Sequence, residues 1–244
     1  MKKIFLYILA GSLCFSACKK DDEVETYKEP EDINVQNNYD EQAITKFMDE
    51  NYLDVQGNIK AFSATDSTDD HQKKLSEMPF TKLPSGTVYI IREGAQPSPG
   101  KEIKETNVIK IMGRAYSYLA TETNGSGVFN SKAAFLNTID GSVVPLVDPM
   151  YYYVKEQSMK DANQVNNRGY FEIAGFKEAI QKFKAYDDLA SEAPYNLQGV
   201  IIVPSKAAFA RNPHYPYLNM SYRNRSFVFN LQVYNSRERL DSEK

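Results

Sequence analysis

The sequence predicts an α+β protein with a mainly antiparallel sheet and an amino-terminal helical extension. The first observation is a series of short β-rich segments, bounded by glycine and proline turns, from residue 86 onward. The second is one amphipathic helical pattern inside this series, at residues 175–186. The third is an earlier helical pattern before the first strand, at residues 44–52. Strands grouped around one helix in this way are typical of α+β domains.

Length and composition narrow the possible classes of protein. At 244 residues, the chain holds one domain with extensions or two small domains. Hydrophobic residues make up 42% and charged residues 25%, which excludes a fully disordered or fibrous chain. Two cysteines exclude a disulfide framework, and two histidines without a Cys-x-x-Cys pair argue against a structural zinc site. Since the net charge is −3, we expect no nucleic-acid partner. We also expect that the chain binds no metal and no cofactor.

The amino-terminal end is typical of an export signal. Two lysines precede an apolar run at residues 4–13, which is too short to span a membrane. The run ends in Phe15-Ser16-Ala17-Cys18, which resembles a lipobox. We therefore expect residues 1–17 to be a lipoprotein signal peptide and Cys18 to be the lipidated residue. This predicts a chain anchored by lipid to the outer membrane. The alternative is an ordinary signal peptide cut nearby, with Cys18 as a spare thiol.

Residues 18–37 are predicted to be a disordered tether. They are rich in charge, contain one proline, and hold few large apolar side chains. The charged run at residues 19–23 resembles signals that send lipoproteins to the cell surface. It is equally well explained as a solvated spacer.

Residues 38–85 are predicted to be the helical extension. A loop at residues 66–70 carries three aspartates but lacks the glycine and terminal glutamate of a calcium loop, so we expect it to be solvated. The helix is predicted by four apolar residues spaced i, i+3, i+4, i+8: Ile44, Phe47, Met48 and Tyr52.

The β-rich part, residues 86–236, is predicted to be the folded body. Its helix has one apolar face and one lysine-rich face, and residues 237–244 follow as a charged tail. A further segment, residues 115–121, either continues the second strand or forms a separate one. The expected strands are residues 87–92, 107–112, 143–146, 151–154, 199–204 and 226–234.

Taken in order, several segments of the body resemble an FKBP-type peptidyl-prolyl isomerase domain. They are Gly86 to Gly100, Asn107 to Gly113, Glu172-Ile-Ala-Gly-Phe176, Val203-Pro-Ser-Lys-Ala-Ala-Phe-Ala210 and Phe227-Val-Phe229. The resemblance implies a curved, mainly antiparallel sheet wrapped on one short helix. It also implies a proline-containing polypeptide or protein as the partner, and we expect a monomer.

The resemblance further implies a substrate pocket. Phe129 and Asn130 match a Phe-Asp pair on the rim of that pocket. The pocket-wall positions are matched by Ile173, Phe176, Phe209 and Phe229. From the residues alone, these side chains are better explained as a hydrophobic core, and only the resemblance makes the pocket an equal alternative. The register leaves Ile111 or Tyr118 as the matching residue of the strand at 107–121.

Three departures from the family pattern weaken the expectation of catalysis. Phe176 replaces a tryptophan, Phe209 replaces a tyrosine whose hydroxyl binds substrate, and Asn130 replaces an aspartate. Prolyl isomerisation needs an apolar pocket and a few aimed hydrogen bonds rather than a nucleophile. The sequence therefore supports two hypotheses: a weak or inactive prolyl isomerase that helps proteins fold outside the inner membrane, or a non-catalytic peptide- or protein-binding module.

A long insertion, residues 132–167, separates the rim from the helix. It contains Tyr151-Tyr152-Tyr153, which we expect to form a strand. The alternative is a tyrosine recognition surface beside the pocket.

Overall fold

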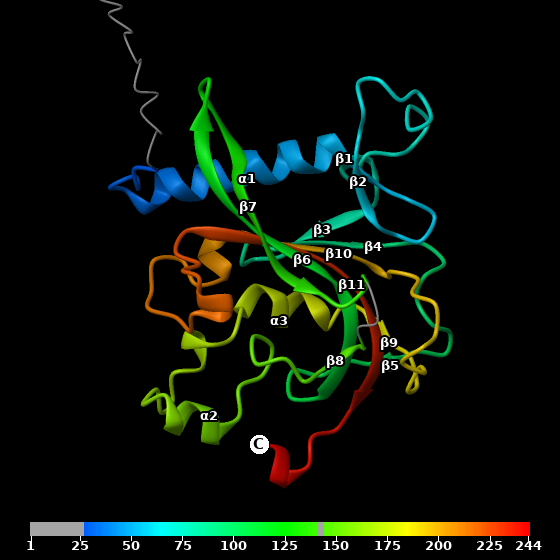
Figure 1. Ribbon diagram of the computed structural model, residues 1–244, viewed down its shortest axis with the longest axis vertical. Coiled ribbons are helices and arrows are strands. Elements are labelled where there is room, and N and C mark those ends of the chain that lie inside the picture. The colour runs from blue at the N-terminus through cyan, green and yellow to red at the C-terminus, as the bar shows by residue number, and fades with distance from the viewer. Residues whose placement is uncertain (1–26, 141–143) are drawn as a thin grey trace, which may run out of the picture.

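The computed structural model describes residues 27–140 and 144–244 of the chain (Figure 1). The expected signal peptide, residues 1–17, and Cys18 lie outside these residues. Among the helices that are described, none combines the length and the apolar character needed to cross a bilayer.

The body is built on one seven-stranded antiparallel sheet with the order β3-β4-β10-β11-β6-β7, and β8 pairs with β6 beside β7. A short helix, α3 (Ala174–Ile180), packs against one face of this curved sheet (Figure 1). The predicted α+β class, with a mainly antiparallel sheet around one short helix, is therefore confirmed. The strands are β3 (Phe80–Lys82), β4 (Val88–Ile91), β6 (Val108–Thr123), β7 (Ser126–Asn137), β8 (Leu146–Val147), β10 (Gly199–Val203) and β11 (Arg225–Arg237).

Smaller elements surround the sheet. β1 (Asn51–Leu53) pairs with β2 (Ile59–Ala61), and β5 (Lys101–Glu102) pairs with β9 (Lys184–Ala185). The helix α2 (Glu156–Asp161) lies within the insertion. The long helix α1 (Ile33–Glu50) crosses the face of the sheet opposite α3 (Figure 1).

The two faces of the sheet follow from the alternation of side chains along its strands. Phe227 and Phe229 of β11 pack in the core on the α3 face, while Val228 packs in the core under α1. Successive side chains of a strand point to opposite faces, so a strand that is covered on both faces is apolar throughout. β10 shows this most fully, since all five of its residues are buried.

The helix α1 begins earlier than the sequence predicted. Asp32 caps it, because a carboxylate oxygen of Asp32 accepts a hydrogen bond from Asn34 N at 2.8 Å. An aspartate immediately before an apolar residue is a helix-start signal that the high local charge obscured.

The segment before α1 is attached to the body. The Tyr27 hydroxyl donates to Gln36 Oε1 at 2.8 Å, and the Glu29 carboxylate pairs with Arg223 at 2.6 Å and Arg211 at 3.6 Å. The prediction of a disordered tether over residues 18–37 is therefore wrong from residue 27 onward. Glu29, one of the charges that predicted disorder, forms ion pairs with distant residues of the chain.

Two further expectations differ from the structure, and one alternative that the sequence left open is decided. The predicted helix over 175–186 ends at Ile180, because Lys184 and Ala185 pair with β5 instead. The predicted strand at 151–154 is a turn in which Tyr152 N and Tyr153 N both donate to Pro149 O. Residues 115–121 continue the second strand, and they belong to a long hairpin with β7 that the polar sequence of β7 did not reveal.

The charged tail also packs on the body. The Arg239 side chain is almost fully buried, forms an ion pair with Asp148 at 2.5 Å and lies 3.5 Å from the centre of the Tyr153 ring. The guanidinium group of Arg239 therefore contacts the insertion and is not solvated as the sequence predicted.

Candidate functional site

Four of the predicted pocket residues lie together on the α3 face of the sheet. Ile173 precedes α3, Phe176 lies on α3, Phe209 follows β10 and Phe229 lies on β11. The rings of Phe176 and Phe229 are 4.4 Å apart between centroids. Each of the four residues is at most 1% exposed. The sequence therefore identified residues that meet in space, but they do not line an open cavity.

The space in front of these residues is filled by other aromatic rings. The Tyr151 ring centroid lies 5.4 Å from that of Phe176 and 5.7 Å from that of Phe229. Phe135 packs edge-on against Phe229 at 6.0 Å. Tyr217 and Tyr222 complete the packing around Phe135, at 5.5 and 5.4 Å. We call these rings, together with Phe176, Phe209 and Phe229, the aromatic cluster.

The predicted rim pair lies elsewhere. Phe129 stacks on Tyr118 at 4.9 Å and packs against Phe47 of α1, on the opposite face of the sheet. The Asn130 side chain is exposed and donates to Thr121 Oγ1 at 2.6 Å. The assignment of Phe129 and Asn130 to the pocket is therefore not supported by their positions, because both belong to the β6–β7 hairpin, which the sequence did not predict.

Phe135 is the aromatic residue of β7 that reaches the cluster. Sequence reasoning missed it, although it stands in the short apolar run 133–136, which is the available signal. The same geometry decides the register of β6, since Ile111 lies in the core on the α3 face and Tyr118 lies in the core under α1.

Most polar groups near the aromatic cluster are used to hold the loop at 210–224. The Tyr217 hydroxyl donates to Phe171 O at 2.8 Å, and the Tyr222 hydroxyl donates to Tyr217 O at 2.9 Å. His214 stacks on Phe209 at 4.8 Å, and its Nε2 accepts a hydrogen bond from Tyr222 N at 2.7 Å. Burial raises the pKa of the Tyr217 hydroxyl well above its ordinary value, so it remains a neutral donor.

Tyr151 differs from these residues. Its hydroxyl is buried and has no hydrogen-bond partner among the described residues. Burial raises the pKa of this hydroxyl far above its ordinary value. A buried polar group without a partner is unfavourable, and such a group calls for an explanation.

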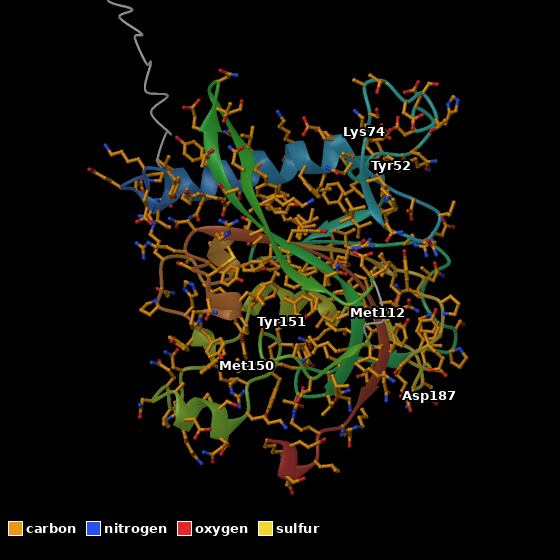
Figure 2. The ribbon with its side chains drawn as sticks, viewed as in Figure 1. Tyr52, Lys74, Met112, Met150, Tyr151 and Asp187 are labelled. Carbon is orange, nitrogen blue, oxygen red and sulfur yellow. The ribbon has the colours of Figure 1, made fainter. Side chains whose placement is uncertain are left out.

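An open pocket lies on the outer side of the aromatic cluster. It has a volume of about 310 Å³, and we call it the outer pocket. Tyr151, Phe135 and Tyr217 belong both to its wall and to the cluster, so they separate it from Phe176 and Phe229. Figure 2 shows Tyr151 beside α3 and its neighbour Met150 nearer to α2. The lining residues are Phe135, Leu136, Leu146, Val147, Asp148, Pro149, Met150, Tyr151, Tyr217 and Leu218.

The outer pocket is apolar and carries no unbalanced charge. Asp148 is the one charged residue among the described residues that line it, and it is paired with Arg239. Two lining residues are strongly exposed for aliphatic side chains, namely Val147 at 56% and Leu218 at 65%.

A second depression, of about 410 Å³, is polar and lies beside α3. Its central carboxylate, Glu172, is buried and accepts hydrogen bonds from Val154 N, Arg168 and Lys177, each at 2.9 Å. Because these charged groups are paired with one another, they give no indication that the depression binds a ligand. Within residues 27–140 and 144–244, no group of three or more His, Cys, Asp or Glu side chains has the arrangement to hold a metal ion.

Comparison with known proteins identifies no sequence relative and a distant structural similarity. No protein-family model matches the chain, and no curated protein matches its sequence. Among solved structures, the chain is similar to the crystal structure of FkpA from Escherichia coli, with a TM-score of 0.36 and 16% sequence identity. The match covers 65% of this chain and 52% of FkpA, so the chain spans about half of that protein's length.

Proposed function

We propose that this chain is an FKBP-like peptide- or protein-binding module that does not catalyse prolyl isomerisation. The observation that carries the proposal is the closed aromatic cluster. The Tyr151 ring packs against both Phe176 and Phe229, and Tyr151 is 4% exposed. A prolyl isomerase needs an accessible apolar site that favours the twisted amide over the planar one. A cluster filled by its own rings leaves no space for a proline ring.

The polar groups support the same proposal. Phe209 has no hydroxyl to hold a substrate carbonyl, and the exposed Asn130 side chain donates to Thr121 Oγ1 and is not part of the aromatic cluster. The loss of one neutral hydrogen bond reduces binding or rate by roughly 2- to 13-fold, from about 0.5–1.5 kcal/mol. The absence of these groups therefore adds to the steric obstacle.

The test is an exchange NMR measurement of cis/trans interconversion in a proline-containing tetrapeptide. We expect the wild-type chain at high micromolar concentration to leave the exchange rate at its uncatalysed value. Tyr151→Ala removes the ring that fills the space, and Phe80→Ala, at an exposed and distant position, is the matched control. Acceleration by the wild-type chain, at a rate that Phe80→Ala retains, would overturn the proposal in favour of the isomerase.

We also propose that residues 1–17 are removed and that Cys18 carries lipid, which anchors the module to the outer membrane as a monomer. The support is the sequence Phe15-Ser16-Ala17-Cys18 after an apolar run. The mature chain should then be found with outer-membrane vesicles, and Cys18→Ser should release it into the soluble fraction. An intact mass without lipid on Cys18 would contradict this part of the proposal.

A further inference from the structure

We propose that the outer pocket binds an extended, uncharged segment of a partner polypeptide, which places one apolar side chain in the pocket and pairs with the edge of β7. The Tyr151 hydroxyl then donates to a backbone carbonyl of that segment. The inference rests on the proposed binding function and names the site and the chemistry of its ligand.

Shape and charge identify the kind of side chain that the outer pocket accepts. Its walls are leucine, valine, proline, methionine and aromatic side chains, and its volume of about 310 Å³ suits one side chain rather than a folded surface. Asp148 is neutralised by Arg239, so the outer pocket offers no unpaired charge to a charged ligand. A charged side chain would lose its hydration there without gaining a partner, whereas an aliphatic side chain would be favoured.

The Tyr151 hydroxyl is an independent indication of a ligand. Tyr151 lines the outer pocket, yet its hydroxyl has no partner among the described residues. Nearby tyrosines do not share this feature, since Tyr217 and Tyr222 both donate to backbone carbonyls. A neutral hydroxyl that is held in an apolar site needs an acceptor, and a peptide carbonyl is an acceptor that brings no charge.

Leu218 at the rim points to the same site. This leucine is 65% exposed and adopts φ 53° and ψ 27°, in the left-handed region that leucine disfavours. Residues held in such conformations are concentrated at functional sites. Here the conformation holds an apolar side chain at the mouth of the outer pocket, where a bound peptide would cover it.

The edge of β7 indicates that the ligand is an extended backbone. β7 is the last strand of its sheet and pairs with β6 alone among the described strands. Residues 130–134 of this edge are mostly exposed, with the carbonyl of Ser131 already accepting from Arg225, and the same strand supplies Phe135 and Leu136 to the outer pocket. An edge strand presents unpaired N–H and C=O groups that an extended peptide satisfies by adding a strand. The polypeptide partner therefore matches both the pocket and the edge beside it.

The probes for the experiment are blocked seven-residue peptides of threonine and serine with a central leucine or a central lysine. Binding is measured by calorimetry and by NMR shift changes of the intact protein. We expect the leucine peptide to bind with shift changes at Leu136, Leu146 and Leu218. We expect the lysine peptide to bind at least about tenfold more weakly, because its charge must be desolvated.

Two variants test the assignment of residues. Tyr151→Phe should raise the thermal midpoint, since it removes a buried hydroxyl without a partner. It should also lower the affinity for the leucine peptide by about 2- to 13-fold. A merely structural tyrosine would not give these opposite effects. Leu218→Asn suits the left-handed backbone and should weaken binding by at least about threefold. Its matched control is Val55→Asn, at a side chain that is 90% exposed and distant from the pocket, which should bind as the wild type does.

The outcomes separate this inference from the proposed function. If the leucine peptide binds with shift changes elsewhere on the surface, the site assigned here is wrong, while the binding module stands. If vesicles of phosphatidylethanolamine and phosphatidylglycerol, and not the peptides, shift the resonances of Leu146 and Leu218, the pocket is a lipid contact and the inference is overturned. Only accelerated cis/trans exchange by the wild-type chain would reject the proposed function itself.

Discussion

Asp40 provides a strong test of how the helix α1 is attached to the sheet. This aspartate is fully buried on α1, and its carboxylate accepts a hydrogen bond from Ser205 N at 2.8 Å and another from Gln36 Nε2 at 3.1 Å. Burial raises the pKa of the Asp40 carboxyl above its ordinary value, against the opposing effect of these hydrogen bonds. The perturbation is Asp40→Ala, with Asp40→Asn as the isosteric variant.

The magnitude follows from the partners that would be left behind. Ser205 N also lies 3.1 Å from Ser226 Oγ and keeps that acceptor. Gln36 Nε2 keeps the carbonyl of Ala120 at 2.9 Å but loses the acceptor for its second hydrogen. One buried donor without a partner costs about 1–3 kcal/mol. We therefore expect Asp40→Ala to lower the free energy of unfolding by about 1–3 kcal/mol at pH 5.

The pH dependence has a definite sign. Because the folded-state pKa of Asp40 is raised, its contribution to stability is complete below the ordinary value of 3.8 and is lost as the pH rises through the raised pKa. Asp40→Asn cannot ionise, so its stability should fall less than that of the wild type between pH 4 and pH 8.

The assay is urea unfolding followed by tyrosine fluorescence and circular dichroism at several pH values. Asp49→Ala, an exposed carboxylate on the same helix, is the control and should change stability by less than about 0.5 kcal/mol. Equal unfolding midpoints for Asp40→Ala and Asp49→Ala would refute the reasoning. Parallel pH curves for the wild type and Asp40→Asn would refute the assigned direction of the pKa.

Three further predictions concern the packing around the site. Glu172→Gln leaves the buried Lys177 with only the more distant carboxylate of Glu105, at 3.6 Å, and should cost about 3 kcal/mol in urea unfolding; an unchanged midpoint would mean that the ion pair with Glu172 does not stabilise the fold. Gly127→Ala places a Cβ 2.5 Å from Tyr39 O, so α1 must shift from β7, which proteolysis near residue 40 should report; wild-type resistance would argue against this close contact. Asp32→Ala removes the cap of α1 and should cost about 0.5–2 kcal/mol by thermal unfolding; no loss would mean that the cap is dispensable.

The parts of the fold that the sequence predicted are those with a strong local pattern. β11 alternates between two buried faces, β10 is apolar throughout, and the apolar face of α3 contains Phe176. The parts that it missed depend on distant partners. The turn at Tyr151 to Tyr153 looks β-rich, but its geometry is fixed by Pro149 and by the carbonyl of Tyr151, which accepts from Ile173 N at 2.7 Å.

The candidate site shows the same division. Ile173, Phe176, Phe209 and Phe229 could be grouped from their sequence context, and they do meet in the structure. Whether they line a cavity or fill a core depends on Tyr151 and on rings from two other segments, β7 and the loop at 210–224. Burial is decided by the whole set of neighbours, and no local pattern reports it.

The attachment of Glu29 to Arg223 and Arg211 has a mechanical consequence. Both arginines belong to the loop at 210–224, which also carries Tyr217 and Leu218 at the mouth of the outer pocket. A pull on the chain ahead of residue 27 is therefore transmitted to this loop through Glu29, as well as to α1 through Tyr27 and Gln36. Tension at that end and occupancy of the outer pocket load the same short stretch of backbone.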